Sequence, residues 1–152
     1  MNDMATQKND LTTEQDGASL IAIGEQAIPI PYALLLSKNH SPLDVRLWCS
    51  MRIFYEEKRA LSLSDYTDLL DSTTEQLEES LAILDMSGWL VVVYQDGNPT
   101  QPQLCAQQLN WEQIQSHNPG FIESLERYKT GGTERVSNMA VKILEQLQTE
   151  RR

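Results

Sequence analysis

Residues 62–98 constrain the fold of this chain more than any other segment. Leucines and a tyrosine recur there at helical spacing on both sides of a polar turn at residues 71–73, and the second helical stretch stops at Gly88. A β-branched run at residues 90–94 and a turn signal at residues 95–99 follow. Apolar residues three and four apart form one helix face, whereas a short β-branched run bounded by Gly and Pro is typical of a strand. The segment therefore predicts two short helices, a tight turn and a hairpin.

A further helix is predicted before this segment. Ser41 can cap it, Pro42 suits its first position, and Asp44 completes a capping box. Ser64 is expected to cap the second helix, and the third should run over residues 74–87. The inward positions of these helices and the base of the hairpin should form one core, with these members: Trp48, Leu63, Tyr66, Leu69, Leu70, Leu77, Leu81, Leu84 and Trp89.

The predicted fold class is mainly α with a small β-wing, a winged helix-turn-helix, followed by C-terminal helices. A return strand is expected at residues 103–106, and helices at residues 111–115, 121–129 and 134–149. The polar residues 1–26 are predicted to be a disordered or loosely packed tail. Residues 27–110 should form the winged-helix domain, and residues 111–152 a helical extension.

Motifs between residue 27 and about residue 145 carry a wider resemblance. They are the Ile-Pro-Ile-Pro-Tyr lead-in at residues 28–32, the helix start at residues 41–44, Trp48, the two-helix segment and the Gly-Trp-Leu step at residues 88–90. In this order they resemble helix-turn-helix proteins of integrating conjugative elements, pathogenicity islands and plasmids, often described as replication or relocation proteins. The resemblance implies a winged-helix fold and a role in a DNA transaction of a bacterial mobile element.

The chain departs from that family in its charges. Such relatives typically carry Arg or Lys in the third helix and a basic wing, but here Glu75, Glu78 and Glu79 lie in the helix and Asp96 in the wing. Thr67 stands where Ala is usual, and Asp71 where the turn usually has Gly. Residues 60–126 hold eleven carboxylates and no Lys or Arg, within a chain of net charge -10. Because DNA binding draws most of its affinity from cations that neutralise phosphates, this charge opposes direct DNA contact.

A recognition helix presents the outward residues of its N-terminal half to the major groove. Here the outward residues expected in the third helix are Thr74, Glu75, Gln76, Glu78 and Glu79. Glutamine can read adenine and glutamate can accept a hydrogen bond from cytosine, so base contacts are chemically open. The phosphate contacts that support them are missing, since the helix N-terminus offers only about half a positive charge.

Two basic groups could contact phosphates instead. Arg46, Arg52, Lys58 and Arg59 lie on or just after the first helix, where they contact phosphates or form an ordinary solvated helix face. The second group lies near the C-terminus: Arg127, Lys129, Arg135, Lys142, Arg151 and Arg152. This group either contacts phosphates or forms a soluble tail on a dimerisation helix.

The last predicted helix carries an apolar seam, formed by Val136, Ala140, Ile143 and Leu147 at a four-three-four spacing. Such a stripe must pack either on the rest of the chain or on a second copy. We expect it to support a homodimer through residues 134–149.

The sequence gives no sign of catalysis, a metal or a cofactor. His40 and His117 lie far from any cysteine or carboxylate pair with ligand spacing, and no phosphate loop or nucleophile motif is visible. Cys49 and Cys105 are expected to be reduced core thiols. With no signal peptide and no apolar run long enough for a membrane span, we expect a cytoplasmic location.

Two functions remain open. One is a non-catalytic winged-helix protein in replication, transfer or transcriptional control, with DNA contact that is weak or requires a complex. The other is an acidic winged-helix module, or DNA mimic, that docks on a basic protein partner.

Overall fold

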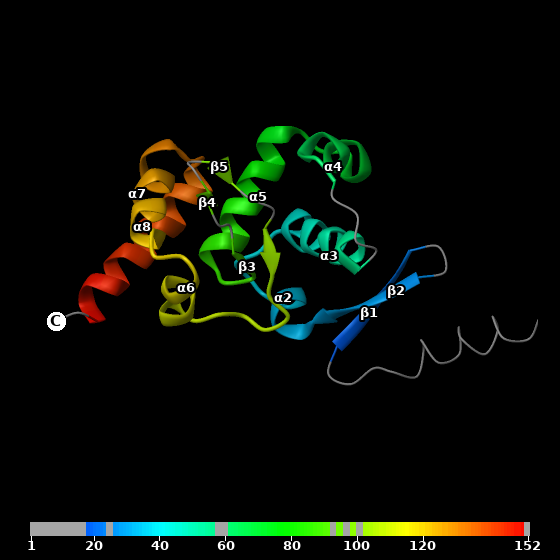
Figure 1. Cartoon of the computed structure of the whole chain (residues 1–152), viewed down its shortest axis with the longest axis horizontal. Helices are drawn as coiled ribbons and strands as arrows, with labels where there is room; N and C mark the ends of the chain where they lie inside the picture. The colour runs from blue at the N-terminus through cyan, green and yellow to red at the C-terminus, as the bar shows by residue number, and fades with distance from the viewer. Residues whose placement is uncertain are drawn as a thin grey trace, which may run out of the picture. The chain divides into compact units, whose positions relative to one another are not determined.

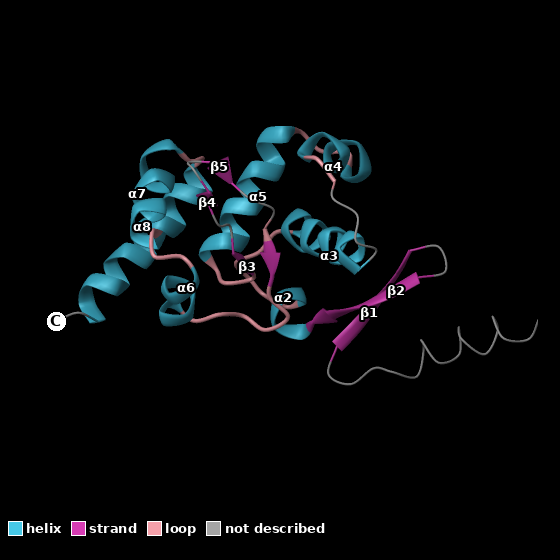
Figure 2. Ribbon diagram, in the orientation of Figure 1, coloured by secondary structure: helices cyan, strands magenta, loops and turns pink. Residues whose placement is uncertain are grey.

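The computed structural model describes residues 18–23, 26–56, 61–91, 94–95, 98–99 and 102–150. The chain divides into two compact units, Met1–Asn39 and His40–Arg152. The described part is mainly helical with small antiparallel strand pairs, as Figure 2 shows. The predicted mainly α class with a few short strands is thus confirmed.

The first unit contains a hairpin and one helical turn. Strands β1 (Ala18–Ile23) and β2 (Gln26–Pro31) pair in antiparallel register from Ala18↔Pro31 to Ile23↔Gln26. Helix α2 (Tyr32–Leu35) follows directly, with Pro31 as its N-cap at φ -59° and ψ 131°. Residues 18–23, part of the segment predicted to be disordered or loosely packed, form one strand of this pair. The rest of that predicted tail, residues 1–17, lies outside the described residues.

The second unit begins with three helices: α3 (Pro42–Glu56), α4 (Leu63–Leu70) and α5 (Thr74–Met86). The predicted capping box of α3 is present, since Ser41 N donates to Asp44 Oδ2 at 2.9 Å and Asp44 N to Ser41 Oγ at 3.2 Å. Helix α4 is capped by Ser62 and not by Ser64, because Ser62 and Asp65 form a capping box of their own.

Short strands follow α5. Gly88, at φ 87°, turns the chain out of the helix, and β3 (Leu90–Val91) pairs with β6 (Gln103–Leu104). Between them β4 (Tyr94–Gln95) pairs with β5 (Asn98–Pro99). The predicted strand and its return strand are therefore present in part, as β3 and β6, while the β4–β5 ladder lies mainly in the segment predicted to be a turn.

Three further helices complete the unit: α6 (Trp111–His117), α7 (Phe121–Gly131) and α8 (Glu134–Glu150). Figure 1 shows α5 running between α3 and α4 on one side and α7 and α8 on the other. Accordingly, every residue of α5 from Ala82 to Met86 is buried. Helix α5 is the central element of this unit.

The core extends over both sides of α5. Trp48 Nε1 donates to the Trp89 carbonyl at 3.0 Å, and the two rings meet edge to face at 6.5 Å. On the other side α5 packs against a cluster from the later helices, whose largest buried members are Ile114, Phe121, Leu125, Val136, Ile143, Leu144 and Leu147. Of the predicted core, Leu63 and Leu81 are half-buried, and the prediction was wrong for Leu69, which is 50% exposed.

All four residues of the apolar seam on α8 are buried in this same cluster. The stripe on which the expected homodimer through residues 134–149 rested is thus covered within the chain. The alternative, packing back on the domain, is the one the structure adopts.

Candidate nucleic-acid interface

The turn between α4 and α5 has a left-handed residue at its centre. Asp71 caps α4 at φ 51° and ψ 54°, and it is the one non-glycine residue with positive φ in the described part of the chain. Asp tolerates this conformation better than most residues, because its short polar side chain bonds locally. Asp71 thus makes the turn between α4 and α5 without a glycine.

A second capping box begins α5. Thr73 N donates to Gln76 Oε1 at 3.0 Å, and Gln76 N donates to Thr73 Oγ1 at 3.1 Å. The side-chain oxygen that would accept from an adenine amino group is therefore already engaged. The Thr-x-x-Gln spacing is the sequence signal that could have revealed this.

The outward face of α5 is as acidic as predicted in its first two turns. Thr74, Glu75, Gln76 and Glu78 are all exposed. Glu79 is a correction: its side chain is only 25% exposed, and its Oε1 lies 3.6 Å from Nη1 of Arg135. Helix α5 therefore presents Glu75 and Glu78 outward, while Glu79 contacts α8.

Helix α4 and the turn enlarge this acidic surface. Asp65, Asp68 and Asp71 are exposed, and Leu69 is exposed among them. We define the helix-turn-helix (HTH) face as these exposed residues of α4, α5 and the turn between them: Asp65, Asp68, Leu69, Asp71, Thr74, Glu75 and Glu78. It joins five carboxylates with one apolar side chain, and the sequence supplies no Lys or Arg anywhere between residues 60 and 126.

Arg135, a predicted phosphate contact, is instead part of an internal network. It donates to both carboxylate oxygens of Asp44, with 3.2 Å between Nη1 and Oδ1. The Asp44 side chain has no exposed surface, and Ser80 of α5 also bonds to it. Arg135 thus joins α3, α5 and α8, and it is committed to carboxylates within the chain.

The electrostatics of this network favour the ion pair. Burial alone raises the pKa of the Asp44 carboxyl, but hydrogen bonds from Arg135, Ser80 and the Ser41 backbone, with the charge of Arg135, lower that pKa below its ordinary value. The same hydrogen bond from Arg135 to Asp44 raises the pKa of the guanidinium. Sequence reasoning missed this network because Asp44 and Arg135 are separated by 91 positions.

The other predicted cations belong to elements other than α4 and α5. On α3, Arg46 is exposed, and the Arg52 guanidinium lies 5.9 Å from the centroid of the Trp48 ring. On α7, Arg127 donates to Ser124 Oγ at 3.0 Å, and Lys129 is 3.9 Å from Glu126. Lys142 is exposed on α8. The remaining predicted cations, Lys58, Arg59, Arg151 and Arg152, lie outside the described residues.

His40 joins the start of α3 to the end of α5. Its Nε2 lies 2.8 Å from Ser87 Oγ, and Ser87 Oγ donates to the Ile83 carbonyl at 2.6 Å. Burial lowers the pKa of His40, Asp44 raises it in part, and Arg135 lowers it further.

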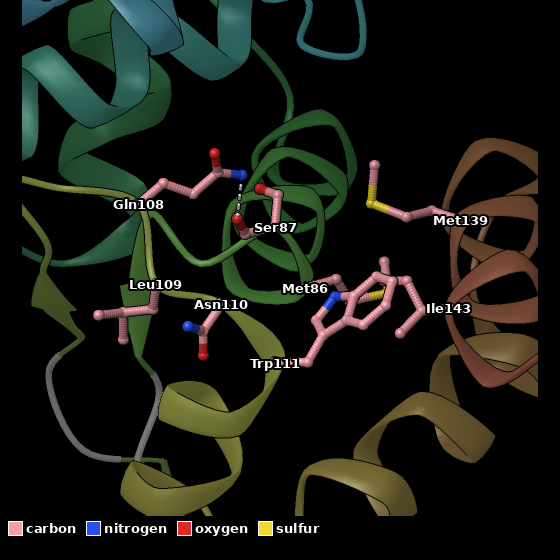
Figure 3. Close-up of a pocket in the computed structure, with 8 residues that line it drawn as sticks. All are labelled: Met86, Ser87, Gln108, Leu109, Asn110, Trp111, Met139 and Ile143. Atoms are coloured by element: carbon pink, nitrogen blue, oxygen red, sulfur yellow. Dashed lines mark hydrogen bonds between the residues drawn. The ribbon is translucent and has the colours of Figure 1, made fainter. Parts of the chain in front are cut away.

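A groove lies at the C-terminal end of α5. Figure 3 shows Trp111 close to Met86 and Ile143, with Met139 on the same wall and Gln108 bonded to the Ser87 carbonyl at 2.7 Å. The apolar wall comes from Leu109 and from α5, α6 and α8, and the polar rim from Ser87, Gln108 and Asn110. Within the described part of the chain, no group of His, Cys, Asp and Glu side chains could hold a metal ion.

Comparison with protein families, with characterised proteins and with solved structures gives no match for this chain. No helix in the described residues is long and apolar enough to cross a membrane.

Proposed function

We propose that this chain is a non-catalytic winged helix-turn-helix protein that acts in a DNA transaction of a bacterial mobile element. It takes part in replication, transfer or transcriptional control. It binds DNA weakly, or only as part of a complex. The observation that carries the proposal is the succession of α4, a left-handed turn residue at Asp71, α5, the Gly88 turn and the β3–β6 ladder.

The weak DNA contact follows from the charges around α5. Glu75 and Glu78 are where a recognition helix approaches the phosphates, and each adds repulsion. Arg135 is the cation bonded to α5, and Glu79 and Asp44 engage it. Residual affinity for DNA therefore comes from exposed cations elsewhere, such as Arg46 of α3 and Lys142 of α8.

The proposal is tested by titrating a labelled duplex with wild type, Arg46→Glu and Lys142→Glu, using fluorescence anisotropy at low and physiological salt. Wild type should bind no more tightly than about 10 µM at physiological salt, as nonspecific binders do. At least one substitution should weaken the residual binding and flatten its salt dependence. Tight, sequence-selective binding that neither substitution affects would contradict the weak-contact proposal.

A second function is favoured by the exposed Leu69 within the acidic HTH face. Protein interfaces have an apolar centre and a polar rim, and Leu69 with its acidic neighbours offers both on a small scale. In this alternative the HTH face docks on a basic protein surface, and in its extreme form the carboxylates mimic DNA phosphates. Asp68→Lys should then weaken binding of an arginine-rich helical peptide, while Glu145→Lys, the same charge change on α8, should leave it unchanged.

A further inference from the structure

We draw no further inference here: the strongest candidate, the groove at the C-terminal end of α5 between Met86, Trp111, Met139 and Ile143, is an apolar surface, and nothing in the structure shows what covers it.

Discussion

Arg135 of α8 donates hydrogen bonds from both of its terminal nitrogens to the fully buried carboxylate of Asp44 on α3. Asp44 also caps its own helix through Ser41. One carboxylate thus begins α3 and anchors the last helix of the chain. A substitution at either residue should therefore destabilise the packing of α3, α5 and α8 against one another.

Removing the cation should be costly, because it leaves Asp44 charged and buried. Arg135→Ala is expected to lower the free energy of unfolding by about 3 kcal/mol, the usual cost of breaking a buried ion pair from one side. Lys142→Ala on the same helix, whose side chain is exposed, should change it by less than about 0.5 kcal/mol. Urea unfolding followed by tryptophan fluorescence measures both. Equal effects of the two substitutions would show that the pair contributes little.

Stability should fall as the pH drops below the ordinary pKa of histidine. Burial lowers the pKa of His40 in the folded chain, so the unfolded chain binds the proton more readily. The stabilising contribution of neutral His40 is therefore fully present above its pKa in the unfolded chain, about 6.5. It is lost progressively as the pH falls toward the lower pKa of His40 in the folded chain. The pKa of Asp44 is also lowered, but this carboxyl titrates below about pH 4. It therefore does not contribute to the change in stability near the pKa of histidine.

Urea midpoints measured between about pH 7.5 and pH 5.5 test this dependence. His40→Gln should flatten the decline, since glutamine can bond to Ser87 but carries no titrating proton. His117→Gln, at an exposed histidine, should leave the decline as in wild type. If the urea midpoint of His40→Gln declines with falling pH as steeply as that of wild type, groups other than His40 cause the decline.

Gly88 should tolerate no side chain. Its φ is 87°, and a Cβ there would collide with the carbonyl oxygen of Leu109, which the Leu109 N–H to Gly88 O bond of 2.9 Å holds close. Gly88→Ala should therefore cost more than about 2 kcal/mol, from the left-handed backbone and the clash together. Gly131→Ala is the matched control, because nothing lies within 4 Å of a Cβ there, and it should stabilise α7 by up to about 1 kcal/mol. If Gly88→Ala leaves the free energy of unfolding unchanged, the backbone around Gly88 and Leu109 must be able to move apart.

Local signals in the sequence predicted the local structure well. The capping box at Ser41 and Asp44 needs only residues three apart, and it is present. Where two local signals competed, the stronger one decided: Ser62 and Asp65 satisfy each other, so Ser62 caps α4 in place of Ser64. Leu69 and Leu70 are adjacent and so about 100° apart around the helix; Leu70 faces inward with Tyr66, which leaves Leu69 outward.

Long-range pairings were beyond the sequence. The pattern showed an apolar seam on α8 but not what covers it, and the cluster around Ile83 and Phe121 does so. Charge type alone placed Arg135 among the phosphate contacts, whereas its actual partners come from α3 and α5. The sequence of residues 18–23 did not indicate that they pair with the proline-containing strand at residues 26–31.

The carboxylates of the HTH face are expected to repel duplex DNA. This repulsion is measured by fluorescence anisotropy of a labelled duplex at two salt concentrations, with wild type, Glu75→Lys and Glu78→Lys. Glu145→Lys, which makes the same charge change on α8, is the control. Both substitutions in α5 should tighten binding more than the control does and steepen its salt dependence, because each replaces a repulsive charge with a phosphate-neutralising one. Tight wild-type binding that Glu75→Lys or Glu78→Lys abolishes would show instead that the acidic helix reads bases directly.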